Sequence, residues 1–449
     1  MMVFEAAPPA NLAHACCSGP RAKVAPSKSG TERRIHPATP EWRHKEQANV
    51  NNTMAAIPRG RLPSAADRGD MAPMFRTSTL PSRVIPAALA VSILTAAMPA
   101  LAAKPAPPLD PSAPMVAVAE STTQVWTALV VLPDGRMILD APAWTGTPGP
   151  TLALRDADGT IHPYPDARWN DPATPPEKRL ISAESIQLAD DGTLWVLDSG
   201  FDGTDHAVAP AKLVKLDTHA ASVTQSWTID PAVLRPGSHV AGVRVGKGHA
   251  FILDSGVPGL IVVNLEHGTQ RRLMDHNPSL TAQHPITVNG RVMQDTTGHT
   301  AIVNANEIEI SPDEQWLYYQ STGGPLYRLG TDLLTDTTIT SFELDDSPTL
   351  WYKTPPLGGM TVARDGTLYF DDISTGSIFR FTAGRVYQRI VVDPRLRWPA
   401  TPTITATGQL YIPTAQLDRT PRFNHGQMAV QWPLTIYRID TAALPAPVR

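Results

Sequence analysis

The feature of this 449-residue chain that most limits its fold is a sixfold internal repeat. Six times, an alternating apolar strand is followed by a polar turn, a second strand and a third strand. The first two strands of the repeats are predicted at 126–139, 184–198, 242–254, 306–319, 359–370 and 403–412. The third strands follow at 151–155, 212–216, 260–265, 325–329, 377–381 and 434–439. Asp-Gly pairs in several of the turns favour hairpins, because glycine adopts a positive φ without a steric clash.

The number of strands predicts a closed ring. The first five repeats carry a fourth strand, as at 223–229 and 386–392, whereas little sequence follows the third strand of the sixth repeat. A spare strand at 115–119 precedes the first repeat. We therefore predict an all-β fold, a six-bladed β-propeller closed by pairing of the N-terminal strand in the last blade, which removes an open sheet edge. A β-sandwich and a β-helix are the alternatives, but β-helix coils are shorter than the spacing of roughly 50 residues seen here.

The first seventy residues differ from the rest of the chain. Residues 1–70 are rich in Ala, Pro, Arg and Ser and show no sustained apolar period. We interpret them as a disordered leader, or as sequence ahead of a true start at Met71 or Met74.

The next segment, 71–103, has the pattern of a secretory signal. Arg76 and Arg83 precede an apolar run at 84–101, and small residues close the segment. A positive region, a short apolar region and small residues before a cleavage point are typical of such signals. A retained membrane anchor is the alternative, but two prolines interrupt the run and a spanning helix needs about 20 apolar residues. We expect a propeller at 104–449 that is secreted or periplasmic.

Composition excludes several classes of function. The net charge is -4 and the predicted propeller has no long basic run, so we expect no nucleic-acid partner. The two cysteines, Cys16 and Cys17, both lie in the leader, which excludes disulfides, thiolate metal sites and a cysteine nucleophile from the propeller. Neither an HExxH nor a GxSxG motif occurs. We expect a monomer without membrane contact after signal cleavage, with a small molecule as its partner.

An ordered series of segments resembles one known family. The segments are PYPDARWN (163–170), SIQLADDGTLWVLDSG (185–200), ILDSGVPGLIVVNL (252–265), SPDEQWLYY (311–319) and DPRLRWP (393–399). Together they resemble the major royal jelly protein and insect yellow family. The resemblance implies a six-bladed propeller, export and small-molecule ligands, and some insect members resemble dopachrome-converting enzymes. A more distant likeness is to the gluconolactonase and regucalcin propellers.

The entrance of the central channel is where a ligand is expected, because the innermost strand of each propeller blade lines the channel. One comparable entrance position is predicted in each repeat: Thr127, Glu184, Gly242, Asn306, Gly358 and Ala400. The resembling family usually has Asp at several of these positions. This chain departs from that pattern, and Glu184 and Asn306 remain as candidate ligand-binding residues.

A metal-dependent alternative rests on the same two residues. Gluconolactonase-type propellers hold one divalent ion with a Glu, two Asn and an Asp, and only Glu184 and Asn306 match here. Ca²⁺ takes six to eight oxygen ligands. Under this alternative, Glu184 and Asn306 bind Ca²⁺ or another divalent cation and the protein hydrolyses a lactone.

Deeper in the predicted channel, polar residues occupy inner-strand positions where apolar ones would be ordinary: Gln187, Arg244 and Glu309. Glu307 and Glu309 share one strand face. One interpretation is an ion-paired lining of Arg244 with a nearby Glu. The other is a polar pocket in which Arg244 anchors a carboxylate or catechol, Gln187 binds the ligand, and Glu307 or Glu309 accepts a proton. A tautomerisation needs a group that removes a proton and one that returns it, and a desolvated Glu suits this role. A non-catalytic ligand-binding protein is the third hypothesis.

The acidic loop 198–206 lacks the alternating acids and the terminal Glu of an EF-hand. Asp198 and Asp254 both stand in LDSG segments at the end of a second strand. We therefore predict that these two residues have a structural role in the blade turns.

Overall fold

The structure, a computed structural model, describes residues 113–204 and 207–446. The predicted leader at 1–70 and the predicted secretory signal at 71–103 lie outside the described residues, as does the end of the acidic loop, 205–206. Among the residues that are described, no helix is both long enough and apolar enough to cross a membrane.

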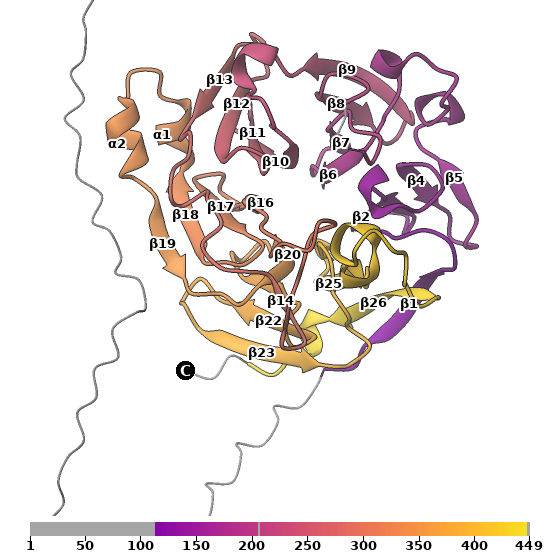
Figure 1. Ribbon diagram of the computed structural model, residues 1–449. Coiled ribbons are helices and arrows are strands. Elements are labelled where there is room, and N and C mark those ends of the chain that lie inside the picture. Colours follow the sequence, from indigo (N-terminus) through magenta and orange to yellow (C-terminus); the bar gives the residue numbers. More distant parts are fainter. Residues whose placement is uncertain (1–112, 205–206, 447–449) are drawn as a thin grey trace, which may run out of the picture. The chain divides into compact units, whose positions relative to one another are not determined.

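Six four-stranded antiparallel sheets stand around a central axis, as the six-bladed prediction requires (Figure 1). Blades 1 and 2 contain β2 (Ala128–Val131), β3 (Met137–Asp140), β4 (Leu152–Arg155) and β5 (Ile161–Pro163), then β6 (Ala183–Leu188), β7 (Thr193–Asp198), β8 (Lys212–Asp217) and β9 (Ser222–Thr228). Blades 3 and 4 contain β10 (Val240–Gly246), β11 (His249–Asp254), β12 (Gly259–Asn264) and β13 (Gln270–Leu273), then β16 (Ala305–Ile310), β17 (Trp316–Ser321), β18 (Leu326–Gly330) and β19 (Thr349–Tyr352). Blades 5 and 6 contain β20 (Leu357–Val362), β21 (Leu368–Asp372), β22 (Ser377–Phe381) and β23 (Tyr387–Val392), then β24 (Thr403–Ile404), β25 (Gln409–Pro413), β26 (Leu434–Asp440) and β1 (Val116–Ser121).

The sixth blade closes the ring with a strand from the start of the propeller. Its order is β1-β26-β25-β24, so the spare strand predicted at 115–119 forms its outer edge. Val116 pairs with Arg438 and Ser121 pairs with Leu434 in an antiparallel ladder. The prediction of closure by the N-terminal strand is therefore confirmed.

Apolar side chains between neighbouring blades form the core. Between blades 1 and 2, for example, Ile138, Leu194 and Val214 are fully buried in one cluster. Successive residues of a strand point to opposite sheet faces, so each blade contributes one apolar face to each neighbour. This packing fixes the inner strands around the axis.

In five of the six blades the turn between the first and second strands has a glycine with a positive φ, whereas blade 4 has Glu314 (φ 55°) there. Gly192 has a φ of 82°, a conformation that side chains other than glycine rarely adopt. A Cβ at this position would also lie 2.8 Å from Nε2 of His219. The side chain of Asp191 closes the turn by accepting a hydrogen bond from the amide of Thr193 (2.9 Å).

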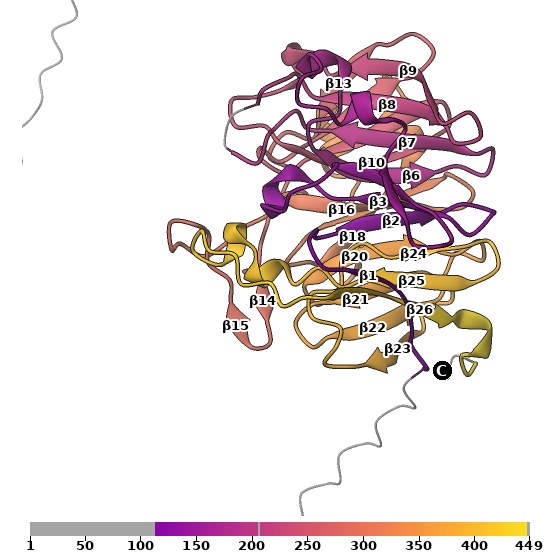
Figure 2. The same ribbon diagram turned by 90° about the vertical axis from the view of Figure 1, so that its right-hand side faces the viewer.

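The connections between blades carry short elements. A hairpin of β14 (Thr287–Val288) and β15 (Arg291–Val292) precedes blade 4, and Figure 2 shows it projecting from the blades. The helices are α1 (Thr331–Thr335), α2 (Ser341–Asp345), η1 (Ala143–Thr145), η2 (Ala167–Trp169), η3 (Pro176–Lys178), η4 (Pro231–Val233), η5 (Leu417–Arg419), η6 (Pro421–Phe423) and η7 (Thr441–Ala443). Of these, η1, η5 and η6 contribute to the site described next.

Candidate active site at the channel mouth

A pocket of about 120 Å³ lies at one end of the central channel and is lined by inner segments of all six blades. Each blade contributes the residue at the same place in its ladder: Thr127, Glu184, Ala241, Asn306, Gly358 and Ala400. The ladders of blades 2 and 4 have an irregularity at Glu184 and Asn306. A β-bulge can direct a side chain away from the sheet, which explains how these two polar residues reach the pocket.

The position predicted for blade 3 was wrong by one residue. Val240 pairs with Asp254, as Ala183 pairs with Asp198, so Ala241 and not Gly242 is equivalent to Glu184. Gly242 was assigned from the family resemblance, and the tight two-residue turn between Gly246 and His249 shifts the blade 3 position relative to the other repeats.

The absence of a side chain at Gly358 has a packing reason. A Cβ there would lie 1.8 Å from the carbonyl oxygen of Pro399 in the next blade. No residue larger than glycine fits without movement of the backbone, so the close contact between blades 5 and 6 excludes an acid from this position.

Glu184 has a carboxylate surrounded by donors. Oε1 accepts hydrogen bonds from Oγ of Ser182 (2.7 Å) and Oγ of Ser199 (2.8 Å), and Oε2 accepts one from Nε1 of Trp144 (2.8 Å). Nε2 of His239 lies 3.7 Å from Oε1. Burial acts to raise the pKa of Glu184, but the charge of His239 and the hydrogen bonds outweigh it, so the pKa is lowered. Glu184 is therefore ionised and gives the pocket a fixed negative charge.

Glu307 is the second carboxyl in the pocket, and it has far fewer donors. Its residue is 7 % exposed. Nδ2 of Asn306 donates to Oε1 of Glu307 (2.7 Å), while Oδ1 of Asn306 accepts from Oγ1 of Thr322 (2.9 Å). Burial raises the pKa of Glu307 to about 7, against smaller lowering effects of Asn306 and of the Arg244 charge. A carboxyl that titrates near neutral pH is able both to accept and to return a proton.

Arg244 and Glu309 form a buried ion pair. Nε and Nη2 of Arg244 donate to the two carboxylate oxygens of Glu309, at 2.9 and 3.1 Å, and Nη1 donates to the carbonyl of Val243 (2.7 Å). Arg244 and Glu307 line the pocket, whereas Glu309 does not. Glu309 is thus the ion-pair partner of Arg244 outside the pocket lining, and Glu307 is left as the candidate proton acceptor.

Gln187 also lies outside the pocket lining. Its side chain binds the backbone of blade 3, where Oε1 accepts from the amide of Val245 (2.7 Å) and Nε2 donates to the carbonyl of Val245 (3.2 Å). These two hydrogen bonds join the inner strands of blades 2 and 3, which is a structural role.

Aromatic side chains that no periodicity in the sequence pointed to form another part of the pocket wall. Trp144, Trp398 and Phe423 all line the pocket. The rings of Trp398 and Phe423 stack with centroids 5.2 Å apart, and the guanidinium of Arg422 lies 5.1 Å from the centre of the Trp144 ring. Trp398 has a φ of 44°, a left-handed conformation that costs about 1–3 kcal/mol for a residue other than glycine. Such strain is found most often at ligand sites.

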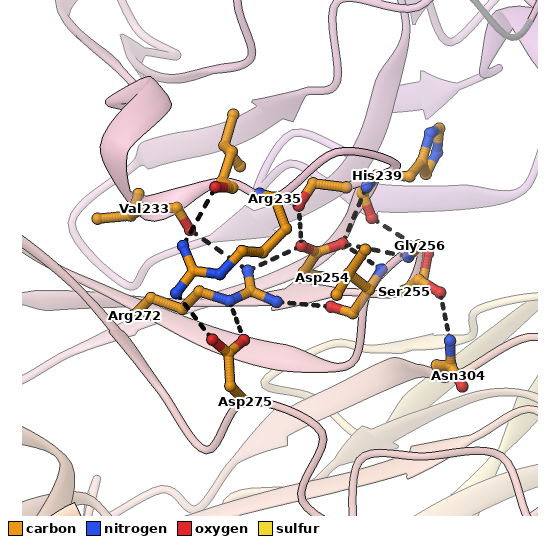
Figure 3. A network of polar contacts seen from close by, with 12 residues as sticks. Val233, Arg235, His239, Asp254, Ser255, Gly256, Arg272, Asp275 and Asn304 are labelled. Carbon is orange, nitrogen blue, oxygen red and sulfur yellow. Dashed lines mark hydrogen bonds and ion pairs between the residues drawn. The ribbon is translucent and has the colours of Figure 1, made fainter. Parts of the chain in front are cut away.

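A polar network in blade 3 holds His239 at the pocket (Figure 3). The carboxylate of Asp254 accepts hydrogen bonds from the amide of His239 (2.9 Å) and from Nη1 of Arg272 (2.8 Å). Arg272 also donates to Asp275. Nδ2 of Asn304, just before β16, donates to the carbonyl of Ser255 (2.9 Å) and so joins the network to blade 4. Asp254 therefore has the structural role at the end of the second strand that its LDSG segment predicts.

Asp198 has the equivalent role in blade 2. Its carboxylate accepts hydrogen bonds from the amides of Ile181 and Ser182, both at 2.9 Å, and pairs with Nζ of Lys212 at 2.6 Å. Because Ser182 in turn donates to Glu184, this buried pair orients the pocket carboxylate.

Two further carboxyls, which the sequence analysis did not single out, are buried in the second strands of blades 1 and 5. Asp140 and Asp371 are fully buried, and neither of their carboxyl groups has a hydrogen-bond partner among the described residues. Burial raises the pKa of both well above the usual range. The charge of Glu184 adds to this effect at Asp140, and that of Glu307 adds to it at Asp371. Burial therefore favours the neutral form of both side chains.

Replacement of Asp371 by asparagine is expected to stabilise the protein at pH 8 and to have little effect near pH 4. The wild-type carboxyl stays protonated in the folded state, whereas in the unfolded state it ionises above its ordinary pKa of about 4, so stability is lost as the pH rises. Asparagine does not ionise, and the gain at pH 8 should exceed about 1 kcal/mol, since one pKa unit corresponds to about 1.4 kcal/mol. Urea unfolding at both pH values measures it, with Asp140→Asn as the matched variant. A difference from wild type that stays constant with pH contradicts the prediction.

The residues matched to a metal site do not fit one as they are arranged. The two oxygens of Glu184 already accept three hydrogen bonds, and Oδ1 of Asn306 accepts one from Thr322. In residues 113–204 and 207–446, no three His, Cys, Asp or Glu side chains are grouped so as to hold a metal ion. Ca²⁺ needs six to eight oxygens, so Glu184 and Asn306 do not make up a calcium site.

Fold and site together define a class, that of six-bladed β-propellers with a small polar and aromatic pocket at the mouth of the central channel. The model of the major royal jelly protein family matches residues 181–407, just over half of the chain. The chain belongs to this family. No curated protein matches the chain in sequence.

Several solved propeller structures are distantly similar to this chain. A gluconolactonase from Xanthomonas campestris is 12 % identical, with 74 % of this chain and 90 % of that chain covered and a TM-score of 0.44. A regucalcin from Agrobacterium tumefaciens, a calcium-binding protein, is 14 % identical, with 74 % and 97 % covered and a TM-score of 0.43. Virginiamycin B lyase from Staphylococcus aureus is 12 % identical, with 73 % and 99 % covered and a TM-score of 0.41. Because these identities and TM-scores are low, the likenesses say nothing about the activity of this chain.

Proposed function

We propose that this protein is an exported, monomeric isomerase that binds a catechol-like molecule at the channel mouth and moves a proton within it, as in dopachrome conversion. The proposal of export rests on the pattern of residues 71–103. The pocket volume of about 120 Å³ suits one ring of such a ligand, because cavities of ~150 Å³ hold a single aromatic ring. The side chains of Trp144, Trp398 and Phe423 suit a flat, unsaturated ligand.

The observation that carries the proposal is the contrast between the two pocket carboxyls. Glu184 has a lowered pKa and a full set of donors, so it remains an anion. Glu307 is buried with a pKa of about 7 and one hydrogen bond from Asn306, so it exchanges a proton readily. Two carboxyls whose environments separate their pKa values mark an acid–base site.

The proposed reaction is a balanced proton shift. The carboxylate of Glu307 takes a proton from a ring carbon that an adjacent carbonyl or iminium group makes acidic. The electron pair of the broken C–H bond moves into the ring, and the carboxylic acid of Glu307 then returns the proton to an oxygen of the ligand. No oxidant, reductant or water is consumed, and the product is a tautomer of the substrate. Glu184, as a fixed anion, favours a ligand that carries positive charge near it.

Lactone hydrolysis receives no support from the donor set. That activity would draw on Glu184 and Asn306 as metal ligands, and their oxygen atoms are occupied by hydrogen bonds from protein groups. We therefore propose a single function.

The purified protein is expected to accelerate the loss of dopachrome absorbance over the rate in buffer. Because Glu307 acts as a base, the rate should fall as the pH drops below about 7. The measurement is an absorbance time course at several pH values, with heat-denatured protein as control. A rate no greater than that in buffer contradicts the proposed activity, and saturable binding of the catechol without turnover would identify a binding protein.

A further inference from the structure

A second cavity, of about 390 Å³, lies beside the channel pocket. Its walls come from the β14–β15 hairpin and from the segment around η5 and η6. Figure 2 shows the hairpin projecting next to the yellow C-terminal segment that carries these two short helices. Phe423 lines both cavities, so the second lies against the channel mouth without being part of it.

The side chains that line this cavity carry an excess of positive charge. Three guanidinium groups line it, those of Arg291, Arg397 and Arg419, together with the ring of His425. Asp418 is the single acid in the lining. Its carboxylate is bound to Arg397, with Nε of Arg397 3.0 Å from Oδ2, and is only 5 % exposed. One acid balances one of the three guanidinium groups, so the lining as a whole keeps an excess of positive charge.

Neither Arg291 nor Arg419 is paired with an acid among the described residues. Nη1 of Arg419 donates to Oε1 of Gln416 (2.7 Å), which is a neutral group. The backbone of Arg291 pairs with Val288, but its side chain has no hydrogen bond or ion pair within 113–204 and 207–446, and the residue is exposed. Burial and the neighbouring charge of Arg397 lower the pKa of Arg419, and the opposing charge of Asp418 offsets only part of this effect, so the cationic form is held at a cost. An anion in the cavity would relieve that cost.

The backbone around the cavity includes residues in left-handed conformations, among them Asn289, Gly290 and Gln416. Asn289 and Gly290 both have positive φ, 48° and 74°, which is the turn geometry that places Arg291 at the end of a tight hairpin. Next to the opposite wall, Gln416 has a φ of 46°, and its amide donates to the carbonyl of Arg397 (3.2 Å), a residue that lines the cavity. Residues other than glycine adopt this conformation at a cost of about 1–3 kcal/mol. The folded chain around Gln416 offsets this cost, and the hydrogen bond from Gln416 helps to hold the backbone of Arg397 in place.

We propose that this cavity is a binding site for a small oxyanion of the phosphate, sulfate or carboxylate type, held between Arg291 and Arg419. Guanidinium groups present several N–H donors in a plane and match the oxygens of such anions. The two arginines come from opposite walls, so an anion between them also joins the hairpin to the segment that carries Phe423. This site is separate from the proposed activity and does not depend on it.

The test is titration of the full protein with inorganic phosphate by calorimetry, at an ionic strength held constant with NaCl because exposed charges are screened by salt. Wild type should bind phosphate, and Arg419→Gln and Arg291→Gln should each weaken binding by at least tenfold. Arg168→Gln, at an arginine 84 % exposed in the loop after blade 1, is the matched control and should bind as wild type does.

Three results would overturn the proposal. They are absence of phosphate binding to wild type, equal binding by wild type and the Arg291 variant, and an equal loss in the Arg168 variant. Arg291 lies on an exposed hairpin, so its replacement leaves the blades intact even where the Arg419 variant does not fold. Titration of Glu307→Gln with phosphate separates this site from the channel pocket, because its phosphate affinity should equal that of wild type. Competition by sulfate or acetate then ranks the anion types.

Discussion

Replacement of Glu307 by glutamine is expected to lower the rate of dopachrome conversion by at least about 100-fold, since general acid–base catalysis contributes 10²–10⁴-fold. Glutamine has nearly the same shape and keeps a hydrogen bond with Asn306, but it cannot accept a proton. The fall in rate below about pH 7 should also disappear in this variant, because it reports the titration of Glu307. Steady-state rates at pH 5.5 to 8.5 measure both effects.

Glu309→Gln is the matched variant, two residues along the same strand. Its carboxylate binds Arg244 and does not line the pocket, so we expect a loss of stability while the pH dependence with a midpoint near 7 persists. If the Glu307 variant keeps the wild-type rate, or if the pH dependence follows Glu309 instead, the proposed role of Glu307 is wrong.

Replacement of Arg272 by methionine should reduce the free energy of unfolding by about 3–5 kcal/mol, the typical cost of removing one partner of a buried ion pair. The side chain of Arg272 is 3 % exposed and that of Asp254 is fully buried. Methionine preserves most of the volume but leaves the charge of Asp254 without its cation. Urea unfolding followed by circular dichroism provides the measurement.

Arg364→Met is the control for this prediction, because Arg364 pairs with Asp190 on the surface, where the two side chains are 66 % and 89 % exposed. Exposed pairs contribute roughly 0–1 kcal/mol, so this variant should unfold almost as wild type does. Equal losses in the two variants would show that the network in Figure 3 has no special role in stability.

Much of the architecture was predictable because it is repeated. A strand, an Asp-Gly turn and another strand recur often enough to predict six blades, and the spare strand at 115–119 predicts how the ring closes, as the pairing of Val116 with Arg438 confirms. The role of Asp198 in its blade turn followed from the same repetition. Repetition supplies several independent copies of each pattern, so one irregular copy does not change the predicted fold.

The site was less predictable, because its residues depend on local irregularities. One tight hairpin moved the blade 3 position from Gly242 to Ala241, and only the strand register reveals that. Glu307 and Glu309 share a strand face in the sequence pattern, and which one meets Arg244 depends on the arrangement of two blades. Trp398 comes from a loop without any period, where nothing in the sequence pattern marks it as part of the pocket.

The proton-transfer role of Glu307 is tested most directly by titrating its carboxyl. Carbon NMR of protein labelled at the glutamate carboxyls monitors this titration. We expect one glutamate signal with a midpoint near pH 7 that is absent from Glu307→Gln and that shifts when a catechol is added. A spectrum in which every glutamate titrates below pH 5, or in which the catechol moves no signal, would contradict it.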